Sequence, residues 1–294
     1  MKYLLRINSV KPEKKLLRQA AKVIQQGRLV AFPTETVYGL GANAFDAVAV
    51  RKIFAAKGRP ADNPLIVHVA RAEDVNLVAK KIPLVAQKLM KTFWPGPLTL
   101  VLLKKSVVPN EVTAGSKTVA VRMPAHPVAH GLIMAAGVPI AAPSANVAGR
   151  PSPTSAQHVL EDFGARIDLI LDGGQTRVGL ESTVVDVTGK KVVILRSGEV
   201  TAEHLEKVLG YFPKTAHAKK GAKVKSPGMK YKHYAPKVPM VLVELSNEQK
   251  LVATIQKQIS LLQNQAIDLV CHLERNDWKG QSHIQFRAVD FKPS

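Results

Sequence analysis

The chain has 294 residues, of which 46% are hydrophobic and 22% are charged, a composition typical of a globular protein that buries its own core. Its only cysteine, Cys271, excludes an intrachain disulfide and a cysteine-rich zinc site. The N-terminus has no apolar run long enough for a signal peptide, and no stretch is long enough to span a membrane. We therefore expect a cytoplasmic protein without a membrane segment.

The charge is strongly positive, because 42 Lys and Arg stand against 22 Asp and Glu for a formal net charge of +20. Such a field favours a polyanionic partner, such as a nucleotide, a nucleic acid or an anionic surface. Most lysines are widely scattered, so a coat of solvated lysines explains the charge equally well. Lys214–Lys237 is an exception, with eight lysines and no acid.

Hydrophobic periodicity predicts alternating helices and strands. A helix over Pro12–Gln26 places its apolar residues on one face, and Gly27 follows as a C-terminal cap. A strand over Arg28–Pro33 runs into the hydroxyl-rich loop PTETVYGLG, and a helix follows over Val48–Lys57. The later elements, in order, are strand Leu65–Val69, helix Leu84–Phe93, strands Leu98–Leu103 and Thr118–Val121, helix His126–Ala136, strand Pro139–Ala142, helix Ser155–Phe163, strands Asp168–Leu171, Thr183–Val187 and Val192–Leu195, and helix Ala202–Leu209.

This interleaving predicts an α/β fold. Three strands in near succession after Asp168 indicate a mixed sheet with antiparallel pairs. We expect a first domain over 1–210 and a basic, Gly- and Pro-containing linker over 211–238. A thin second unit is expected over 239–294. Its predicted elements are strand Met240–Leu245, helix Glu248–Leu262 and strand Ile267–His272, followed by about twenty polar residues.

The sequence lacks a GxxxxGK[ST] phosphate loop, GxGxxG, HExxH and GxSxG, so any nucleotide chemistry must use scattered side chains. Polar clusters instead follow the predicted strands, where α/β proteins commonly bind ligands. The clusters are PTETVYGLG (Pro33–Gly41), KGRPADNPLIVHV (Lys57–Val69), TVAVRMPAHP (Thr118–Pro127), APSANVAGRPSPT (Ala142–Thr154), ESTVVD (Glu181–Asp186) and RSG (Arg196–Gly198).

Each cluster alone has a simpler explanation. Lys57 and Arg59 are at or beyond the end of a predicted helix, where cations oppose the helix dipole, so we expect them to carry little core packing. His68 could be a hydrogen-bonded core histidine, and Arg122 an edge-strand charge. The SAN and PSPT segments could be turns or helix caps. The joint occurrence of the clusters, each near a strand end, favours a ligand site.

Together, PTETVYGL, KGRPxxNPLxxH, VRxP, SAN, ESTVVD and RSG resemble the YrdC-type threonylcarbamoyl-AMP synthase family, and they cover Arg28–Gly198 nearly without gaps. The resemblance implies a twisted mixed sheet with helices around a basic cavity. SPGMKYKHYAP (Ser226–Pro236) resembles the family's two-domain branch, which adds a Rossmann-like C-terminal domain. The second unit is about half as long here, so the resemblance implies a small, partial Rossmann-like unit.

The resemblance implies a nucleotidyltransferase. It would convert L-threonine, bicarbonate and ATP into threonylcarbamoyl-AMP, diphosphate and water. A tRNA threonylcarbamoyl transferase complex would then receive the intermediate to form N6-threonylcarbamoyladenosine at tRNA position 37. Mg²⁺ is expected with ATP, without a protein metal site or an organic cofactor. Direct contact with tRNA is left open.

The family motifs also imply roles for individual residues. The catalytic, phosphate-handling residues are Lys57, Arg59, Ser144 and Asn146. The further ATP contacts are Asn63, Thr118, Ser152, Arg196 and, in a segment that covers the nucleotide in relatives, Tyr231 and Tyr234. The threonine contacts are Thr36, His68, Arg122, the backbone of Ala142, and Ser182. Arg122 suits a carboxylate because a guanidinium can donate two parallel hydrogen bonds.

Two other functions fit parts of the pattern. A non-catalytic RNA-binding module would use the same basic cavity, but it would not need both a carboxylate clamp and a phosphate tetrad. ATP consumption that depends on threonine discriminates between these two functions. A carbamoyl-transferring maturase carries this domain beside zinc fingers, and a single cysteine excludes that architecture.

Overall fold

The computed structural model describes residues 3–216 with their side chains, and residues 267–278 and 281–293 as backbone strands. The chain divides into two compact units, Met1–Ala235 and Pro236–Ser294, which are described separately. The elements predicted over Met240–Leu245 and Glu248–Leu262, and most of the predicted linker, lie outside the described residues. Within the described residues, no helix combines the length and apolarity needed to cross a membrane.

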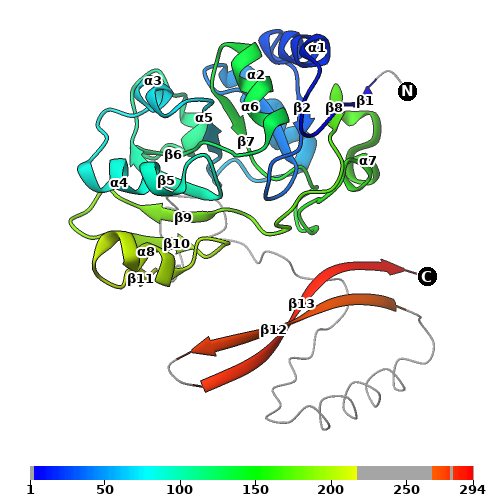
Figure 1. The fold of residues 1–294 in the computed structure, drawn as a ribbon. Coiled ribbons are helices and arrows are strands. Elements are labelled where there is room, and N and C mark those ends of the chain that lie inside the picture. The colour runs from blue at the N-terminus through cyan, green and yellow to red at the C-terminus, as the bar shows by residue number, and fades with distance from the viewer. Residues whose placement is uncertain (1–2, 217–266, 279–280, 294) are drawn as a thin grey trace. The chain divides into compact units, whose positions relative to one another are not determined.

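The first unit alternates helices and strands as predicted (Figure 1). Its helices are α1 (Lys14–Gln25), α2 (Ala47–Lys57), α3 (Val75–Val78), α4 (Leu84–Phe93), α5 (Asn110–Thr113), α6 (Pro127–Ala136), α7 (Ala156–Phe163) and α8 (Ala202–Leu209), with 3-10 turns η1 (Ala72–Asp74) and η2 (Gly164–Arg166). Its strands are β1 (Leu4–Arg6), β2 (Val30–Phe32), β3 (Gly39–Asn43), β4 (Ile66–His68), β5 (Leu98–Leu103), β6 (Thr118–Arg122), β7 (Ile140–Ala142), β8 (Leu169–Asp172), β9 (Thr183–Asp186), β10 (Val193–Arg196) and β11 (Lys214–Thr215).

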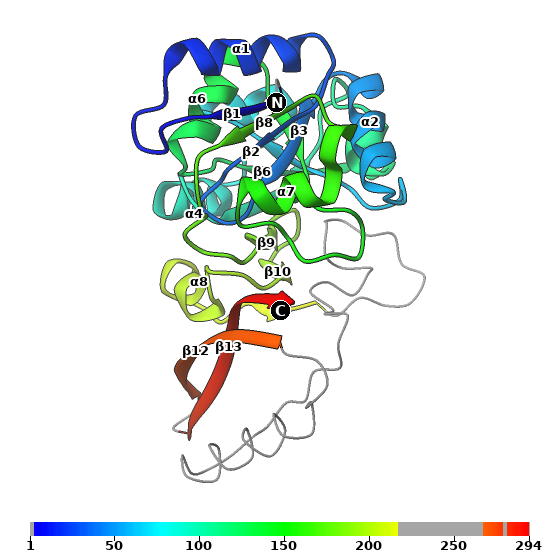
Figure 2. The same cartoon turned by 90° about the vertical axis from the view of Figure 1, so that its right-hand side faces the viewer.

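These strands form one sheet in the order β1-β8-β2-β3-β7-β4-β6-β5-β9-β10-β11. The pairs β1–β8, β8–β2, β4–β6, β5–β9 and β10–β11 are parallel, and the other neighbours are antiparallel. The predicted mixed α/β sheet is therefore confirmed. Figures 1 and 2 show α1 and α6 together at the β1–β8–β2 end, and α8 beside β10 near the other end.

Local sequence signals explain the helix ends that matter for the site. The Asp46 carboxylate accepts hydrogen bonds from the backbone N–H groups of Val48 and Ala49, which caps the start of α2. Gly58 ends this helix in the left-handed region, at φ 59°. This turn directs the chain from Lys57 into the segment that leads to β4.

Three expectations about the sheet were wrong. The end of PTETVYGLG is strand β3, because Gly41 lets Phe32 and Ile140 approach so closely that an added Cβ would meet each at 2.7 Å. β1 was not predicted, because it is partly exposed, whereas the equally short β2, β4 and β7 are fully buried. Lys214–Thr215, in the predicted linker, extends the sheet beside β10.

The second unit contains a two-stranded antiparallel sheet of β12 (Ile267–Trp278) and β13 (Gln281–Pro293). β12 includes the strand predicted over Ile267–His272. The polar tail expected after it instead continues β12 and forms β13. The ladder extends from the Ile267–Pro293 pair to the Trp278–Gln281 pair, and this long-range pairing was not visible in the local pattern.

Candidate active site

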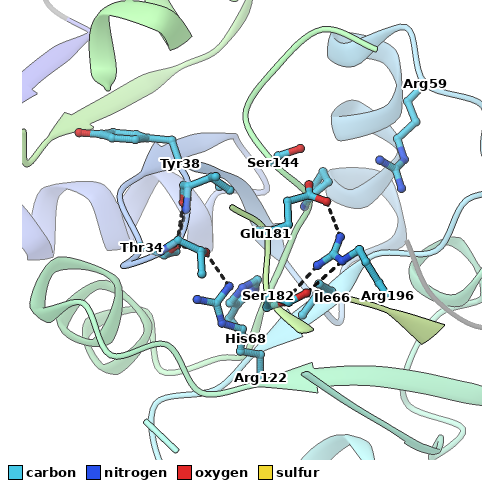
Figure 3. Close-up of a pocket in the computed structure, with 15 residues that line it drawn as sticks. Thr34, Tyr38, Arg59, Ile66, His68, Arg122, Ser144, Glu181, Ser182 and Arg196 are labelled. Atoms are coloured by element: carbon cyan, nitrogen blue, oxygen red, sulfur yellow. Dashed lines mark hydrogen bonds and ion pairs between the residues drawn. The ribbon is translucent and has the colours of Figure 1, made fainter. Parts of the chain in front are cut away.

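A cavity in the first unit collects polar residues from loops and strand ends that are far apart in the sequence (Figure 3). It lies among β4, β6, β7, β9 and β10 and the loop between β2 and β3. The predicted site residues that line it are Thr36, Arg59, His68, Arg122, Ala142, Ser144, Ser182 and Arg196. The other lining residues are Thr34, Val37, Tyr38, Gly39, Ile66, Pro143 and Glu181.

Strand register explains this convergence. His68 and Arg122 are the last residues of the parallel strands β4 and β6, and they are direct partners. On the other side of β6, Arg122 pairs with Thr99 of β5. The Thr99 hydroxyl lies 2.8 Å from the hydroxyl of Ser182, which immediately precedes β9. One row across the sheet therefore joins His68 and Arg122 to Ser182.

The Arg122 guanidinium is held at three points, although its side chain is buried. Nη2 forms an ion pair with Glu35 Oε1 at 2.6 Å, Nη1 donates to Thr36 Oγ1 at 3.0 Å, and Nε donates to the Gly96 carbonyl at 3.2 Å. Glu35 Oε2 accepts from the Ala125 N–H at 3.1 Å. Burial opposes ionisation of Glu35, but the Arg122 charge and these hydrogen bonds outweigh it and lower the pKa of the carboxyl.

Glu35 was not predicted as a site residue. It stands within PTETVYGL, but nothing in the local sequence shows that its partner is an arginine 87 positions away. Glu181 was missed in the same way, inside ESTVVD.

His68 is buried and faces Phe32 edge-on, with ring centroids 6.3 Å apart. Burial, followed by the charge of Arg122, lowers the pKa of His68 to about 3, so the ring is neutral at pH 7. Its Nδ1 is buried without a hydrogen-bond partner among the described residues. His68 also hydrogen-bonds with backbone groups of Ile140 and Ile66, so it is a partly satisfied core histidine whose unpaired Nδ1 favours a ligand contact.

Arg196 lies across the cavity from Arg122. Its Nη1 is 2.5 Å from Glu181 Oε2, Nη2 donates to Ser182 Oγ at 3.0 Å, and Nε donates to the Ser182 carbonyl at 3.0 Å (Figure 3). Ser152, a predicted ATP contact that does not line the cavity, donates to Glu181 Oε1 at 3.3 Å. Glu181 therefore links Ser152 to Arg196.

Lys57 was expected to carry little core packing, and this expectation is wrong. Lys57 is the last residue of α2 and is only 1% exposed. Its ammonium donates to the carbonyls of Ser144 and Asn146, and lies 3.4 Å from Asn146 Oδ1. Burial, with the Arg59 charge, lowers the pKa of Lys57 to about 7. Of the predicted tetrad, Arg59 and Ser144 line the cavity, while Lys57 and Asn146 support the SAN loop behind it.

The remaining predicted ATP contacts lie toward the other ends of the same strands. Arg59 Nη2 donates to the carbonyl of Pro64 at 3.2 Å, and the buried Asn63 Oδ1 has no hydrogen-bond partner among the described residues. Thr118 begins β6, and its hydroxyl lies 2.8 Å from that of Ser116. Thr118 and Arg122 are the first and last residues of β6, four residue steps or about 13 Å apart. Tyr231 and Tyr234 lie outside the described residues.

The free volume of the cavity is ≈ 30 Å³. The Arg196 and Glu181 side chains are only 11% and 9% exposed, so turning Arg196 toward an incoming phosphate would leave Glu181 without its cation.

Gly198, in the RSG segment, packs directly against the backbone of the ESTVVD motif. A Cβ added here would meet the Glu181 carbonyl oxygen at 2.4 Å and the Thr183 nitrogen at 2.6 Å, both backbone atoms that cannot rotate away. We expect Gly198→Ala to lower the free energy of unfolding by about 1–3 kcal/mol. Gly189→Ala is the matched control, since its nearest contact would be an ordinary 3.7 Å. Equal melting temperatures for the two variants would contradict this packing.

Cations, hydroxyls and a neutral histidine surround a cavity at the strand ends of this α/β protein, where α/β proteins commonly bind ligands. A family model described as "Telomere recombination", for Sua5, YciO and YrdC, matches residues 22–198, and one described as "Threonylcarbamoyl-AMP synthase, C-terminal domain" matches residues 200–287. The chain is 57% identical over 230 residues to the threonylcarbamoyl-AMP synthase of Pyrococcus abyssi, covering 78% of this chain and 68% of that protein.

The Bacillus subtilis threonylcarbamoyl-AMP synthase is 51% identical over 238 residues, covering 79% of this chain and 68% of the relative. The crystal structure of P. abyssi Sua5 complexed with L-threonine matches the fold with a TM-score of 0.84 at 51% identity, covering 88% of this chain and 76% of the other. The chain belongs to the YrdC-type threonylcarbamoyl-AMP synthase family, so the predicted family and fold are confirmed.

Proposed function

We propose that this chain is an L-threonylcarbamoyladenylate synthase, which converts L-threonine, bicarbonate and ATP into threonylcarbamoyl-AMP, diphosphate and water. The observation that carries the proposal is the buried Arg122, held by Glu35 and Thr36 beside a neutral His68 with an unpaired Nδ1. The names of the relatives, and L-threonine in the P. abyssi complex, support synthesis over the RNA-binding alternative.

Threonine would bind at the Arg122 end. A guanidinium has five N–H donors, and the contacts to Gly96, Thr36 and Glu35 use three of Arg122's donors, which leaves two for a carboxylate. The polar groups of Thr36 and His68 would then meet the substrate hydroxyl and amine. The hydroxyl of Ser182 and the backbone of Ala142 complete the set of contacts.

ATP would extend from the SAN loop toward Asn63 and Thr118, with Ser152 near its path. The threonine nitrogen attacks bicarbonate and water leaves; the carbamate oxygen then attacks the α-phosphorus, and diphosphate leaves with the electrons of the broken P–O bond. Charge grows on phosphate oxygens, so Arg59 and Arg196 would stabilise it, while Lys57 and Asn146 would hold Ser144 in place.

Mg²⁺ would arrive with ATP and neutralise charge on the departing diphosphate. Within the described residues, no three His, Cys, Asp or Glu side chains are grouped to hold a metal. The carboxylates beside the cavity, Glu35 and Glu181, are each ion-paired with an arginine. These residues fit a metal whose ligands come mainly from phosphate and water oxygens.

The proposed product is a labile mixed anhydride, so it would pass promptly to a tRNA threonylcarbamoyl transferase complex in the cytoplasm. The direct test of synthesis is diphosphate release from ATP, with mass spectrometry of the product. We expect release to require both threonine and bicarbonate. ATP hydrolysis that is independent of threonine would overturn the proposal.

Valine should be a poor substrate, with kcat/KM lower than that of threonine by roughly 100-fold or more. Threonine and valine have nearly the same shape, but valine would leave the buried Nδ1 of His68 without a partner. Diphosphate release measured with threonine, serine and valine checks this expectation. Serine keeps the hydroxyl, so its kcat/KM should fall much less than that of valine. Equal turnover of threonine and valine would refute these contacts.

A further inference from the structure

A second hollow in the first unit shares no lining residue with the cavity described above. It is an open groove of ≈ 720 Å³ bordered by η1, the segment after α3, and α4. Its lining residues are Ala72, Asn76, Lys80, Lys81, Ile82, Gln87, Met90, Lys91, Trp94 and Met123.

The positive charge of this groove is not balanced by acidic side chains among its lining residues. Lys80, Lys81 and Lys91 are exposed, and within residues 3–216 no Asp or Glu lines the groove. None of the ion pairs in that part of the chain involves these lysines. The nearby Asp74 pairs with Arg71 instead. Three cations around one hollow repel each other, so an anion that lies between them is attracted strongly.

The groove also has an apolar part. Met90 is nearly buried, and Ile82, Trp94 and Met123 are half-buried. The Trp94 Nε1–H donates to the Leu98 carbonyl at 2.7 Å, which fixes the orientation of the indole. A fixed aromatic ring beside lysines can stack with a base while the lysines meet the adjoining phosphates.

We propose that this groove binds RNA through a single-stranded or loop segment, outside the cavity that we assign to catalysis. All three lining cations are lysines, which suit phosphates as point charges. An acidic protein partner fits less well, because protein interfaces are depleted in lysine and enriched in arginine. The two amides, Asn76 and Gln87, add donors and acceptors for base edges or sugars.

The groove adjoins the strand end that carries Arg122. Met123 follows Arg122 directly, and its carbonyl accepts from the Gly96 N–H at 2.8 Å, while the Gly96 carbonyl accepts from Arg122 Nε. RNA in the groove would thus lie next to the wall of the proposed threonine site. Binding itself does not depend on the proposed synthesis, although the proximity would help only an enzyme whose product is used on RNA.

The test compares two triple variants of the full chain by fluorescence anisotropy with a labelled RNA stem–loop. Lys80→Gln/Lys81→Gln/Lys91→Gln removes the groove lysines. Its control removes the exposed lysines of α1 (Lys14→Gln, Lys15→Gln and Lys22→Gln). Losing three phosphate contacts should reduce the slope of log affinity against log salt by about 2, and weaken binding on the order of 100-fold at about 0.1 M salt.

The control variant should stay within about threefold of wild type. The chain has two tryptophans, Trp94 and Trp278. In a Trp278→Phe background, stacking predicts that RNA quenches the remaining emission, from Trp94. Equal RNA affinity of the two triple variants, or polyglutamate that binds as tightly as RNA, would overturn the proposal. The second result would favour an acidic protein partner.

Diphosphate release separates this inference from the proposed synthesis. The groove variant should release diphosphate at the wild-type rate, because none of its substitutions lines the cavity. If the wild type releases none while RNA binding still needs the lysines, the proposed synthesis fails and the RNA site stands. A groove variant that loses both activities would contradict a separate site.

Discussion

Arg122→Ala is expected to abolish threonine-dependent diphosphate release and to lower the free energy of unfolding by about 3–5 kcal/mol. The second effect arises because Glu35 would remain as a buried carboxylate without its cation; the two side chains are 4% and 7% exposed, and their charged atoms are 2.6 Å apart. Replacing both residues removes both charges. Arg122→Ala/Glu35→Ala should therefore recover part of the stability but none of the activity.

Thermal or urea unfolding and diphosphate release, measured on the same preparations, separate the two roles. The folded-state pKa of Glu35 lies below its ordinary value of 4.5. Its contribution to stability is therefore present above pH 4.5 and is lost as the pH falls through the lower, folded-state value. The double variant should lack this acid-dependent loss. A double variant that is less stable than Arg122→Ala, or that turns threonine over normally, would contradict the assignment of Arg122 and Glu35.

The sequence predicted much of the sheet because its strands carry local signals. β4, β6 and β7 are buried throughout, so each is a continuous apolar run that ends in a predicted site residue: His68, Arg122 or Ala142. The family motifs supplied the expectation that these ends meet. Sequence alone could not pair Arg122 with Glu35, because that contact depends on the order of strands that are distant in the chain.

The wrong expectations for the segment ending at Gly41 and for Lys57 also arise from contacts between residues that are distant in the chain. Glycines disfavour strands locally, so the segment ending at Gly41 was interpreted as a loop. In the fold, the missing side chain leaves room for the side chains of Phe32 on β2 and Ile140 on β7. Lys57 was interpreted as an exposed helix end because lysines are rarely buried. The carbonyl oxygens that accept hydrogen bonds from Lys57 belong to Ser144 and Asn146, almost ninety residues later in the chain. No local sequence pattern predicts these contacts.

Lys57→Met is expected to reduce diphosphate release by roughly a hundredfold or more. Methionine approximates the length of lysine and suits a buried position, so α2 should persist. The substitution leaves the carbonyls of Ser144 and Asn146 without their donor and removes a positive charge beside the proposed phosphate site. Lys52→Met is the matched control, because Lys52 lies on the same helix, is exposed, and donates to the Gly27 carbonyl at 2.7 Å. It should retain nearly full activity.

The pH dependence of stability provides a second readout for Lys57. Its pKa falls from 10.5 to about 7 on folding, so the unfolded chain binds more protons at this group between those values. The contribution of Lys57 to stability therefore rises with pH over that range and is lost as the pH falls through about 7. The stability of Lys57→Met relative to wild type should be highest below about pH 7 and should decline toward about pH 9. A pH-independent difference, or near-normal diphosphate release by Lys57→Met, would show that the buried ammonium has neither the environment nor the role assigned to it.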